Sequence, residues 1–287
     1  MKYESDADFR RALEERLKNR SRETGEPLER LRKRLVFERC MVRFQKKPES
    51  PWILKGGFAL ELRLGQRARM TKDLDLGMDL AVFGNQELSY SDLVQRMRED
   101  LAEKEDDRLV FLVQEDPSQR PIVQGMKAYR FPVEARLAGR VFEKVRMDVI
   151  LGDPLVPPLE ELVGSDILSF VGIPMPIIRV TSRAQHLAEK VHALTRPLDD
   201  RINTRVKDLI DVQLLMDMGL PEPAVVKNVV ERIFDARQTH PIPQKIQDPP
   251  ATWVSSFTAM AQDLGLAETD SKRAAKRLDD YWINLFH

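Results

Sequence analysis

The segment Leu54–Leu60 (Leu-Lys-Gly-Gly-Phe-Ala-Leu), followed by Arg69–Leu76 (Arg-Met-Thr-Lys-Asp-Leu-Asp-Leu), decides how this chain can be interpreted. Its glycine pair, Gly56-Gly57, precedes a run of apolar residues that favours a helix. Glycine lets backbone N–H groups approach a ligand closely, and a helix N-terminus attracts anions. We therefore predict that the pair opens a helix which, with the preceding Lys55, binds a phosphate group.

A strand is predicted after this helix, and it carries two carboxylates one residue apart. Side chains alternate along a strand, so Thr71, Asp73 and Asp75 share one face, while Leu74 and Leu76 occupy the other. Neighbouring carboxylates repel each other, and a divalent cation between them removes that conflict. Because oxygen ligands suit Mg²⁺, the two segments together predict a site for a metal-bound nucleoside triphosphate.

The same residues resemble a known family. Gly56-Gly57 followed by Thr71–Asp75 resembles the glycine-pair and Asp-x-Asp signature of the nucleotidyltransferase β superfamily. The fuller pattern is similar to that of the AbiEii-type nucleotidyltransferase toxins (AbiEii/AbiGii family) of abortive-infection, type IV toxin–antitoxin systems. The resemblance continues at Val145–Val149, Ala188–Arg196 and Arg205–Val212, so that four blocks stand in the family order.

Composition sets further limits. The 287 residues are 42% hydrophobic and 32% charged with a formal net charge of zero, which permits one large or two ordinary domains. Zero net charge means that any RNA site must be a local basic patch. The one cysteine, Cys40, lies among apolar residues and is expected to be a core residue in a reducing compartment. Neither a signal peptide nor a run of roughly 18–20 apolar residues is recognised, so a soluble cytoplasmic protein with no membrane partner is expected.

The N-terminal region is predicted to form two helices, from Asp8 to about Asn19 and from Leu28 onward. The second presents a basic face, made of Arg30, Lys33, Arg34, Arg43, Lys46 and Lys47. We interpret it either as an RNA-facing surface or as a solvated face of an amphipathic helix.

After Asp75 the pattern indicates an α+β fold. The expected elements are a helix at Ser91–Glu105, a strand at Leu109–Val113, a loop at Asp116–Gly125, and a hairpin with arms Met126–Leu137 and Val141–Leu151. Pro132 suggests that the first arm is an edge strand or contains a bulge.

The C-terminal part reads as nearly all helix from Ser182. Prolines 154, 157 and 158 mark a plausible boundary before it. We predict helices plus a nucleotidyltransferase-like mixed-sheet core over residues 1–155, and a mainly helical domain over residues 156–287.

A third carboxylate, Asp148, lies on a predicted strand whose alternate face is apolar. A charge on such a strand requires a partner or a metal, unless it sits at the end of a strand at the sheet edge. The resemblance implies that Asp148 completes a metal site with Asp73 and Asp75 and acts as a general base.

Lys190 lies at the margin of the apolar stripe of the helix that begins near Ser182. An ordinary lysine there would extend to water. The resemblance implies instead that Lys190 reaches the triphosphate, where its charge neutralises phosphate oxygens. His186 and His192 on the same helix are expected to be packed or surface residues.

Asp208 and Asp211 are three residues apart and so share one face of the next predicted helix. Arg205 and Lys207 are close enough in sequence to pair with them in a salt-bridged helix. The resemblance implies that one aspartate of this block contributes to activity. Asp208 is the first candidate, and Asp211 is the second, binding the base or ribose or orienting Lys190.

One departure from the wider superfamily concerns the glycine pair. Much of the superfamily has Gly-Ser where this chain has Gly56-Gly57, so a serine hydroxyl is absent. Thr71 is expected to supply a hydroxyl near the phosphates, or backbone N–H groups suffice; Gly-Gly is usual in the AbiEii-like group.

The resemblance implies a Mg²⁺- or Mn²⁺-dependent toxin that transfers a nucleoside monophosphate from an NTP to RNA, with the tRNA 3′ end as the expected acceptor. It also implies a separately encoded cognate antitoxin. The alternatives are an antibiotic-type enzyme acting on a small molecule, a protein-nucleotidylating enzyme, and a non-catalytic nucleotide- or partner-binding module. An acidic acceptor cleft would favour a small molecule, and crowded carboxylates argue against a silent module. The preferred NTP, the acceptor, the oligomeric state and direct antitoxin binding have no recognisable signature.

Overall fold

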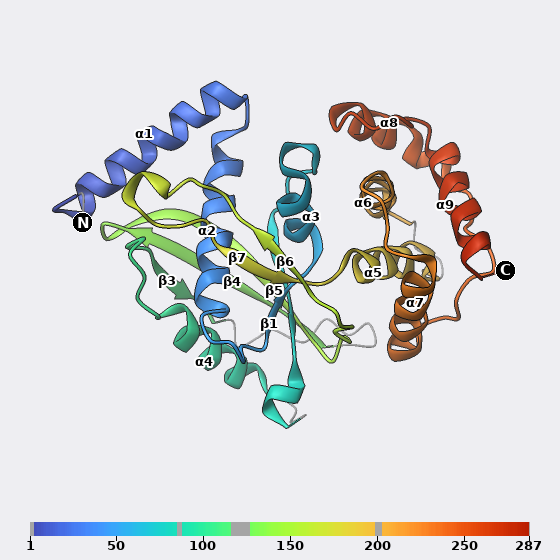
Figure 1. Cartoon of the computed structure of the whole chain (residues 1–287), viewed down its shortest axis with the longest axis horizontal. Helices are drawn as coiled ribbons and strands as arrows, with labels where there is room; N and C mark the ends of the chain where they lie inside the picture. Colours follow the sequence, from blue (N-terminus) through green and yellow to red (C-terminus); the bar gives the residue numbers. More distant parts are fainter. Residues whose placement is uncertain (1–2, 85–87, 116–126, 199–202, 287) are drawn as a thin grey trace. The chain divides into compact units, whose positions relative to one another are not determined.

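The computed structural model describes residues 3–84, 88–115, 127–198 and 203–286, which form two compact units (Figure 1). Unit 1 comprises Met1–Arg63, Met70–Gly152 and Glu160–Val180, and unit 2 comprises Leu64–Arg69, Asp153–Leu159 and Thr181–His287. The chain therefore passes between the units several times, and the single boundary predicted after residue 155 stays a prediction.

Unit 1 is built on a mixed sheet, which has seven strands in the described part of the chain, in the order β3-β4-β5-β2-β1-β7-β6. The strands are β1 (Trp52–Leu54), β2 (Asp73–Met78), β3 (Val110–Val113), β4 (Lys127–Leu137), β5 (Arg140–Leu151), β6 (Glu160–Val163) and β7 (Ile177–Val180). The β2–β5 and β1–β7 pairs are parallel, and the other neighbouring pairs are antiparallel. The predicted α+β fold class is confirmed.

Helices pack on one face of this sheet. They are α1 (Asp6–Thr24), α2 (Leu28–Phe44), α3 (Gly56–Leu64) and α4 (Tyr90–Leu101). Unit 1 also contains the short 3₁₀ helices η2 (Leu80–Phe83) and η3 (Ser169–Val171), whereas η1 (Gly65–Arg67) belongs to unit 2. Helix α2 crosses the sheet and contacts β5 and β7 (Figure 1). Alternate residues of β5, from Val145 to Leu151, are buried in the core, and so are Leu74 and Leu76 of β2. The intervening residues therefore lie on the opposite, less buried face.

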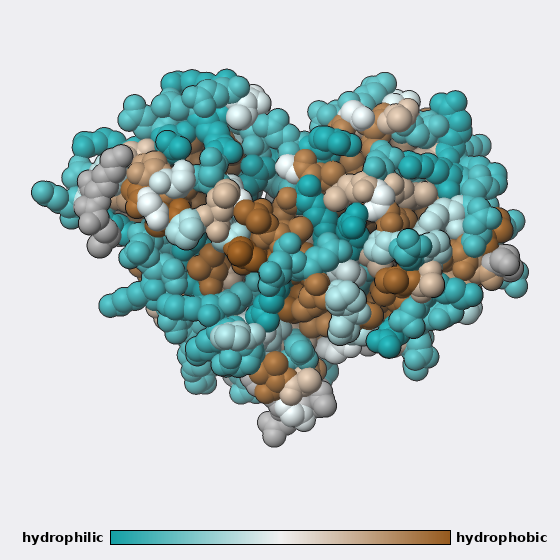
Figure 2. All heavy atoms as spheres, viewed as in Figure 1, coloured by the Kyte–Doolittle hydropathy of each residue, from teal (hydrophilic) through white to brown (hydrophobic). Residues whose placement is uncertain are grey.

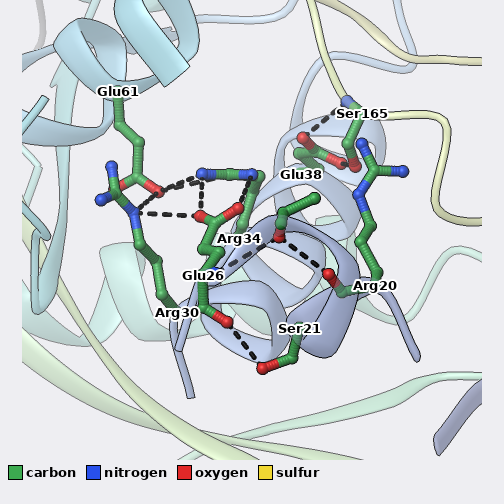
Figure 3. A network of polar contacts seen from close by, with 9 residues as sticks. Arg20, Ser21, Glu26, Arg30, Arg34, Glu38, Glu61 and Ser165 are labelled. Atoms are coloured by element: carbon green, nitrogen blue, oxygen red, sulfur yellow. Dashed lines mark hydrogen bonds and ion pairs between the residues drawn. The ribbon is translucent and has the colours of Figure 1, made fainter. Parts of the chain in front are cut away.

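Most arginines on the basic face of α2 are buried in ion pairs inside unit 1. Arg30 and Arg34 pair with Glu26 and with Glu61 of α3, and all four side chains are nearly buried (Figure 3). Arg43 binds Asp107 in the same way. Both interpretations of this face are therefore wrong for these arginines, because acidic side chains from distant segments neutralise them away from solvent. The network joins α2 to α3, the helix that begins with the glycine pair.

The β4–β5 hairpin confirms the two predicted arms, although Met126 and the predicted loop at Asp116–Gly125 lie outside the described residues. Strand β4 has neighbours on both sides, so Pro132 is not on an edge strand. The proline is tolerated because β3 ends at Val113, opposite Val133, and the next residue, Gln114, donates its N–H to the Pro132 carbonyl at 2.9 Å, a bond that needs no N–H on the proline. The register does shift by one residue opposite Ala135 and Arg136, but the extra residue, Phe142, lies on β5, so the predicted bulge in the first arm is wrong as well.

Unit 2 is predominantly helical, as the C-terminal sequence pattern predicts. It contains α5 (Arg183–Thr195), α6 (Val206–Asp217), α7 (Pro223–Arg237), η4 (Ala251–Trp253), α8 (Val254–Asp263) and α9 (Ser271–Phe286). Helix α5 packs against α6 and α7, and α6 packs against α8 and α9. His186 and His192 are buried within it, which matches the expectation of packed histidines.

Two further features of the composition can be followed in the structure. Cys40 is fully buried in the core of unit 1, as predicted, and burial raises the pKa of its thiol. Hydrophilic residues cover most of the face drawn in Figure 2. Among the helices in the described ranges, none combines the length and hydropathy required to cross a bilayer.

Candidate active site

The glycine pair begins α3, as predicted, and Gly56 lies directly against Asp75. Gly56 has a φ of +62°, a left-handed conformation that side chains disfavour. A Cβ atom at this position would stand 1.9 Å from Oδ2 of Asp75, so the carboxylate occupies the space that glycine leaves open. The N–H of Gly57 donates a long hydrogen bond of 3.4 Å to the same oxygen. The N-terminus of α3 therefore positions an acidic side chain.

Three carboxylates lie on one face of two adjacent strands. Asp73 and Asp75 alternate with buried leucines along β2, and Asp75 is the direct register partner of Asp148 on the parallel strand β5. The carboxylates of Asp73 and Asp148 are partly exposed. The predicted clustering of these three residues is thus a property of the sheet register, and Asp148 lies within the sheet and not at its edge.

Two arginines bind these carboxylates. Arg130 of β4 donates through Nε and Nη2 to the two oxygens of Asp148, at 2.8 and 2.7 Å. Arg146 of β5 donates through Nε to Oδ1 of Asp73 at 2.7 Å. The pKa of Arg130 is raised, first by its hydrogen bond to Asp148, then by the charges of Asp148, Asp73 and Asp75, which outweigh partial burial. All three carboxylates therefore act electrostatically on one guanidinium group.

Asp73, Asp75 and Asp148 together fit a divalent cation, because all three offer carboxylate oxygens and all three lie on one face of the sheet. Within the described ranges, no three His, Cys, Asp or Glu side chains converge into a ready-made cation site. Asp148 and Asp73 direct their oxygens to arginines instead. A cation held by Asp73, Asp75 and Asp148 would therefore have to replace guanidinium groups, and hard oxygen ligands of this type suit Mg²⁺.

A second group of charges lies in unit 2. Lys190 of α5 donates to Asp208 of α6 at 2.9 Å and pairs with Asp211 at 2.8 Å. Arg69 donates through Nε and Nη2 to both oxygens of Asp211, at 2.8 Å each. Arg205 lies 3.5 Å from the other oxygen of Asp208, so part of the expected salt-bridged helix is present. The structure thus brings Lys190 together with both candidate aspartates.

Burial distinguishes the two aspartates. Asp211 is inaccessible to solvent, whereas Asp208 retains some exposure. Burial alone would raise the pKa of Asp211, but Lys190 and Arg69 hold it at about 2. Burial would likewise lower the pKa of Lys190, and the charges of Asp211 and Asp208 raise it instead. Asp211 and Lys190 are therefore both charged at neutral pH.

Two other predicted nucleotide-binding residues have structural contacts of their own. Thr71 was expected on the strand, but β2 begins at Asp73, and the Thr71 hydroxyl donates to the Asp73 carbonyl at 3.1 Å. Its placement on the strand face of the aspartates is therefore wrong, because the chain bends before it enters the sheet. Lys55 is buried, and its N–H donates to the Asp75 carbonyl at 2.9 Å, which joins the loop before α3 to β2.

Three arginines at these sites, Arg69, Arg130 and Arg146, were not predicted as site residues from the sequence. Arg69 stands within the motif that was recognised, so its position was available but its partner was not. Arg146 is two residues before Asp148, and strand alternation could have placed both on one face. Arg130 gave no local signal, because its position depends on the register of the hairpin.

Comparisons with known proteins agree with this architecture. A family model described as the nucleotidyl transferase AbiEii toxin of type IV toxin–antitoxin systems matches residues 39–283. MenT4, a nucleotidyltransferase toxin from Mycobacterium tuberculosis H37Rv, is similar in fold, with a TM-score of 0.54 and 16% identity over 98% of this chain and 99% of that chain. A nucleotidyltransferase candidate from H. pylori aligns with a TM-score of 0.41 and 14% identity over 88% of this chain and 93% of that one. No curated protein matches the sequence. On the family match, the chain belongs to the AbiEii family of nucleotidyltransferase toxins of type IV toxin–antitoxin systems.

Proposed function

We propose that this nucleotidyltransferase transfers a nucleoside monophosphate from an NTP to a hydroxyl of RNA, at the 3′ end of tRNA, with release of pyrophosphate. Membership of the family implies an NTP substrate and a cognate antitoxin. The observation that carries the proposal is the register of Asp75 against Asp148, with Asp75 held against Gly56 at the start of α3. The cytoplasm, where NTPs and tRNA are present, is the proposed location.

The residues of unit 1 would bind and orient the reacting groups. Asp73, Asp75 and Asp148 would hold Mg²⁺ or Mn²⁺, which supplies charge neutralisation for the phosphates. Asp148, the partly exposed register partner of Asp75, would accept the proton of the acceptor hydroxyl. Gly56 and Gly57 would admit the phosphates close to the backbone, beside Lys55 and Thr71.

The residues of unit 2 would supply a fixed positive charge. An ammonium group has three N–H donors, and two of those of Lys190 serve Asp208 and Asp211. We propose that the third binds the β- or γ-phosphate. Asp211, being inaccessible, would orient Lys190 and Arg69, and Asp208 would act at the nucleotide. Positioning and charge stabilisation would provide most of the acceleration.

The test is incubation of the pure protein with total tRNA, Mg²⁺ and each labelled NTP in turn, beside Asp73→Ala and Asp166→Ala. Asp166 is a matched control, because it is also a partly exposed carboxylate of unit 1 paired with an arginine, Arg20. Label on tRNA should appear with the wild type and with Asp166→Ala, and fall by at least about a hundredfold with Asp73→Ala.

Three outcomes would contradict the proposal. Turnover retained by Asp73→Ala would remove the metal-site assignment. Label on the protein, or on an added small hydroxyl compound and not on tRNA, would show one of the other acceptor classes. Absence of label from every acceptor would argue against the transfer reaction itself.

A further inference from the structure

Arg130 occupies a position that a metal-binding carboxylate should keep open. Its guanidinium donates one hydrogen bond to each oxygen of Asp148, so a cation that binds this carboxylate must compete with the arginine for it. Such bidentate pairs are geometrically specific as well as charged. Because the register places Asp148 beside Asp75, this guanidinium also interacts electrostatically with Asp75 and Asp73.

The pair is also open to exchange. The Arg130 side chain is 41% exposed and the Asp148 side chain 19%, so water can solvate the charges when they separate. Ion pairs with this exposure contribute little net free energy. Once a cation binds Asp148, the Arg130 guanidinium loses this bidentate partner, and its paired N–H donors become available to another anion, such as a phosphate of the substrate.

We propose that Arg130 couples metal binding to nucleotide binding, pairing with Asp148 when metal is absent and with a phosphate of the NTP when metal is bound. The inference rests on the proposed function, because it assumes a cation on the carboxylates and an NTP beside it. It assigns Arg130 two opposite effects. The residue competes with the cation for Asp148, and it assists the nucleotide when the cation is present.

Arg136 provides a matched control. It lies on the same strand, is 42% exposed, and binds a carboxylate of its own, Glu134, at 3.0 Å. Replacing Arg130 or Arg136 by glutamine removes one charge and one side-chain pair in either case. Of these two arginines, Arg130 contacts one of the three proposed metal-binding aspartates, Asp148, whereas Arg136 contacts Glu134.

The experiment measures two affinities in the full-length protein. Mn²⁺ binding without nucleotide is followed by electron paramagnetic resonance, and binding of the α,β-methylene analogues of the four NTPs at saturating Mg²⁺ is followed by calorimetry. Arg130→Gln should bind Mn²⁺ about two- to fivefold more tightly and the preferred analogue about five- to tenfold more weakly. Arg136→Gln should change neither affinity, and Arg130→Lys, which keeps the charge but loses the fork, should fall between wild type and Arg130→Gln.

The opposite signs separate this role from a structural one. Damage to the fold would weaken both affinities in Arg130→Gln, and that result would overturn the inference, as would two unchanged affinities in a protein whose wild type binds both ligands. Unchanged analogue binding with weakened tRNA binding would assign Arg130 to the acceptor and also overturn it. A wild-type protein that binds neither Mn²⁺ nor any analogue would overturn the proposed function, and this inference with it.

Discussion

Asp148 in the sheet and Asp211 in the helical unit each accept two hydrogen bonds from one arginine, yet their surroundings differ. The Asp148 side chain is 19% exposed and pairs with Arg130, whereas Asp211 is 0% exposed and is held by both Arg69 and Lys190. Separating a partly exposed pair costs little, because water replaces the partner. A buried carboxylate has no such replacement. The sheet therefore holds pairs that can exchange for ligands, and the helical unit holds pairs that fix side chains in place.

The largest expected effect is the difference in unfolding free energy between variants that lack Asp211 and variants that lack Asp148. Asp211→Ala leaves Lys190 and Arg69 without their buried counter-charge and should lower the free energy of unfolding by about 3–5 kcal/mol. Asp148→Ala should lower it by no more than about 1 kcal/mol while abolishing nucleotidyl transfer. Urea denaturation of both variants measures the difference, and similar losses in the two would show that exposure does not separate the two classes of pair.

A smaller expected effect is the pH dependence of stability, which should differ between two buried carboxyl groups. Asp211 is paired with cations, whereas Glu38 has its pKa raised by burial. Lys190 and Arg69 lower the pKa of Asp211 from 3.8 to about 2, so the stability this group contributes is present above pH 3.8 and is lost as the pH falls towards 2. Glu38 is also buried, but its donors are the N–H and hydroxyl of Ser165 (Figure 3). Burial raises its pKa from 4.5 to about 7, so its contribution is present below pH 4.5 and is lost as the pH rises through 7.

Unfolding free energies measured from pH 2 to pH 8 should show both slopes in the wild type. Asp211→Asn should lose about 2 kcal/mol of pH dependence in the acid window, and Glu38→Gln about 2–3 kcal/mol of pH dependence near neutrality. Each variant serves as the control for the other, since neither should change the other's window. A Glu38→Gln variant with an unchanged slope near neutrality would show that Glu38 does not titrate in this window.

The sheet site was more predictable from sequence than the arginines around it. Strand alternation and the glycine pair depend on neighbouring residues, so the shared face of Asp73 and Asp75 and the start of α3 could be read locally. Arg130 could not, because the hairpin closes with Leu137 opposite Arg140 and a bulge opposite Ala135/Arg136 then shifts the register by one residue. Without that bulge Arg130 would face Met147, on the other side of the sheet.

The helical cluster shows a different limit. Asp208 and Asp211 were recognised as neighbours because three residues make most of one helical turn. Arg69, however, lies 142 residues before Asp211, and no local pattern indicates that a segment between two parts of unit 1 packs with α6. Similarly, the arginines of α2 form a basic stripe in the sequence. Only the tertiary structure shows that Arg30 and Arg34 form ion pairs with Glu61 and Glu26 away from solvent.

The smallest expected effect concerns the glycine that positions Asp75. Gly56 and Gly84 share a φ of +62°, so alanine at either position meets the same left-handed strain, about 1 kcal/mol. At Gly84 an added Cβ atom would meet no heavy atom within 4 Å among the described residues beyond its chain neighbours, whereas at Gly56 it would collide with the Asp75 carboxylate. Gly56→Ala should therefore cost about 2 kcal/mol and displace Asp75, and Mn²⁺ binding should weaken in this variant but not in Gly84→Ala. Equal Mn²⁺ affinity in the two variants would mean that the Asp75 carboxylate does not need the open space at Gly56. Asp75 would then, like Asp148, have contacts that can be exchanged without loss of the site.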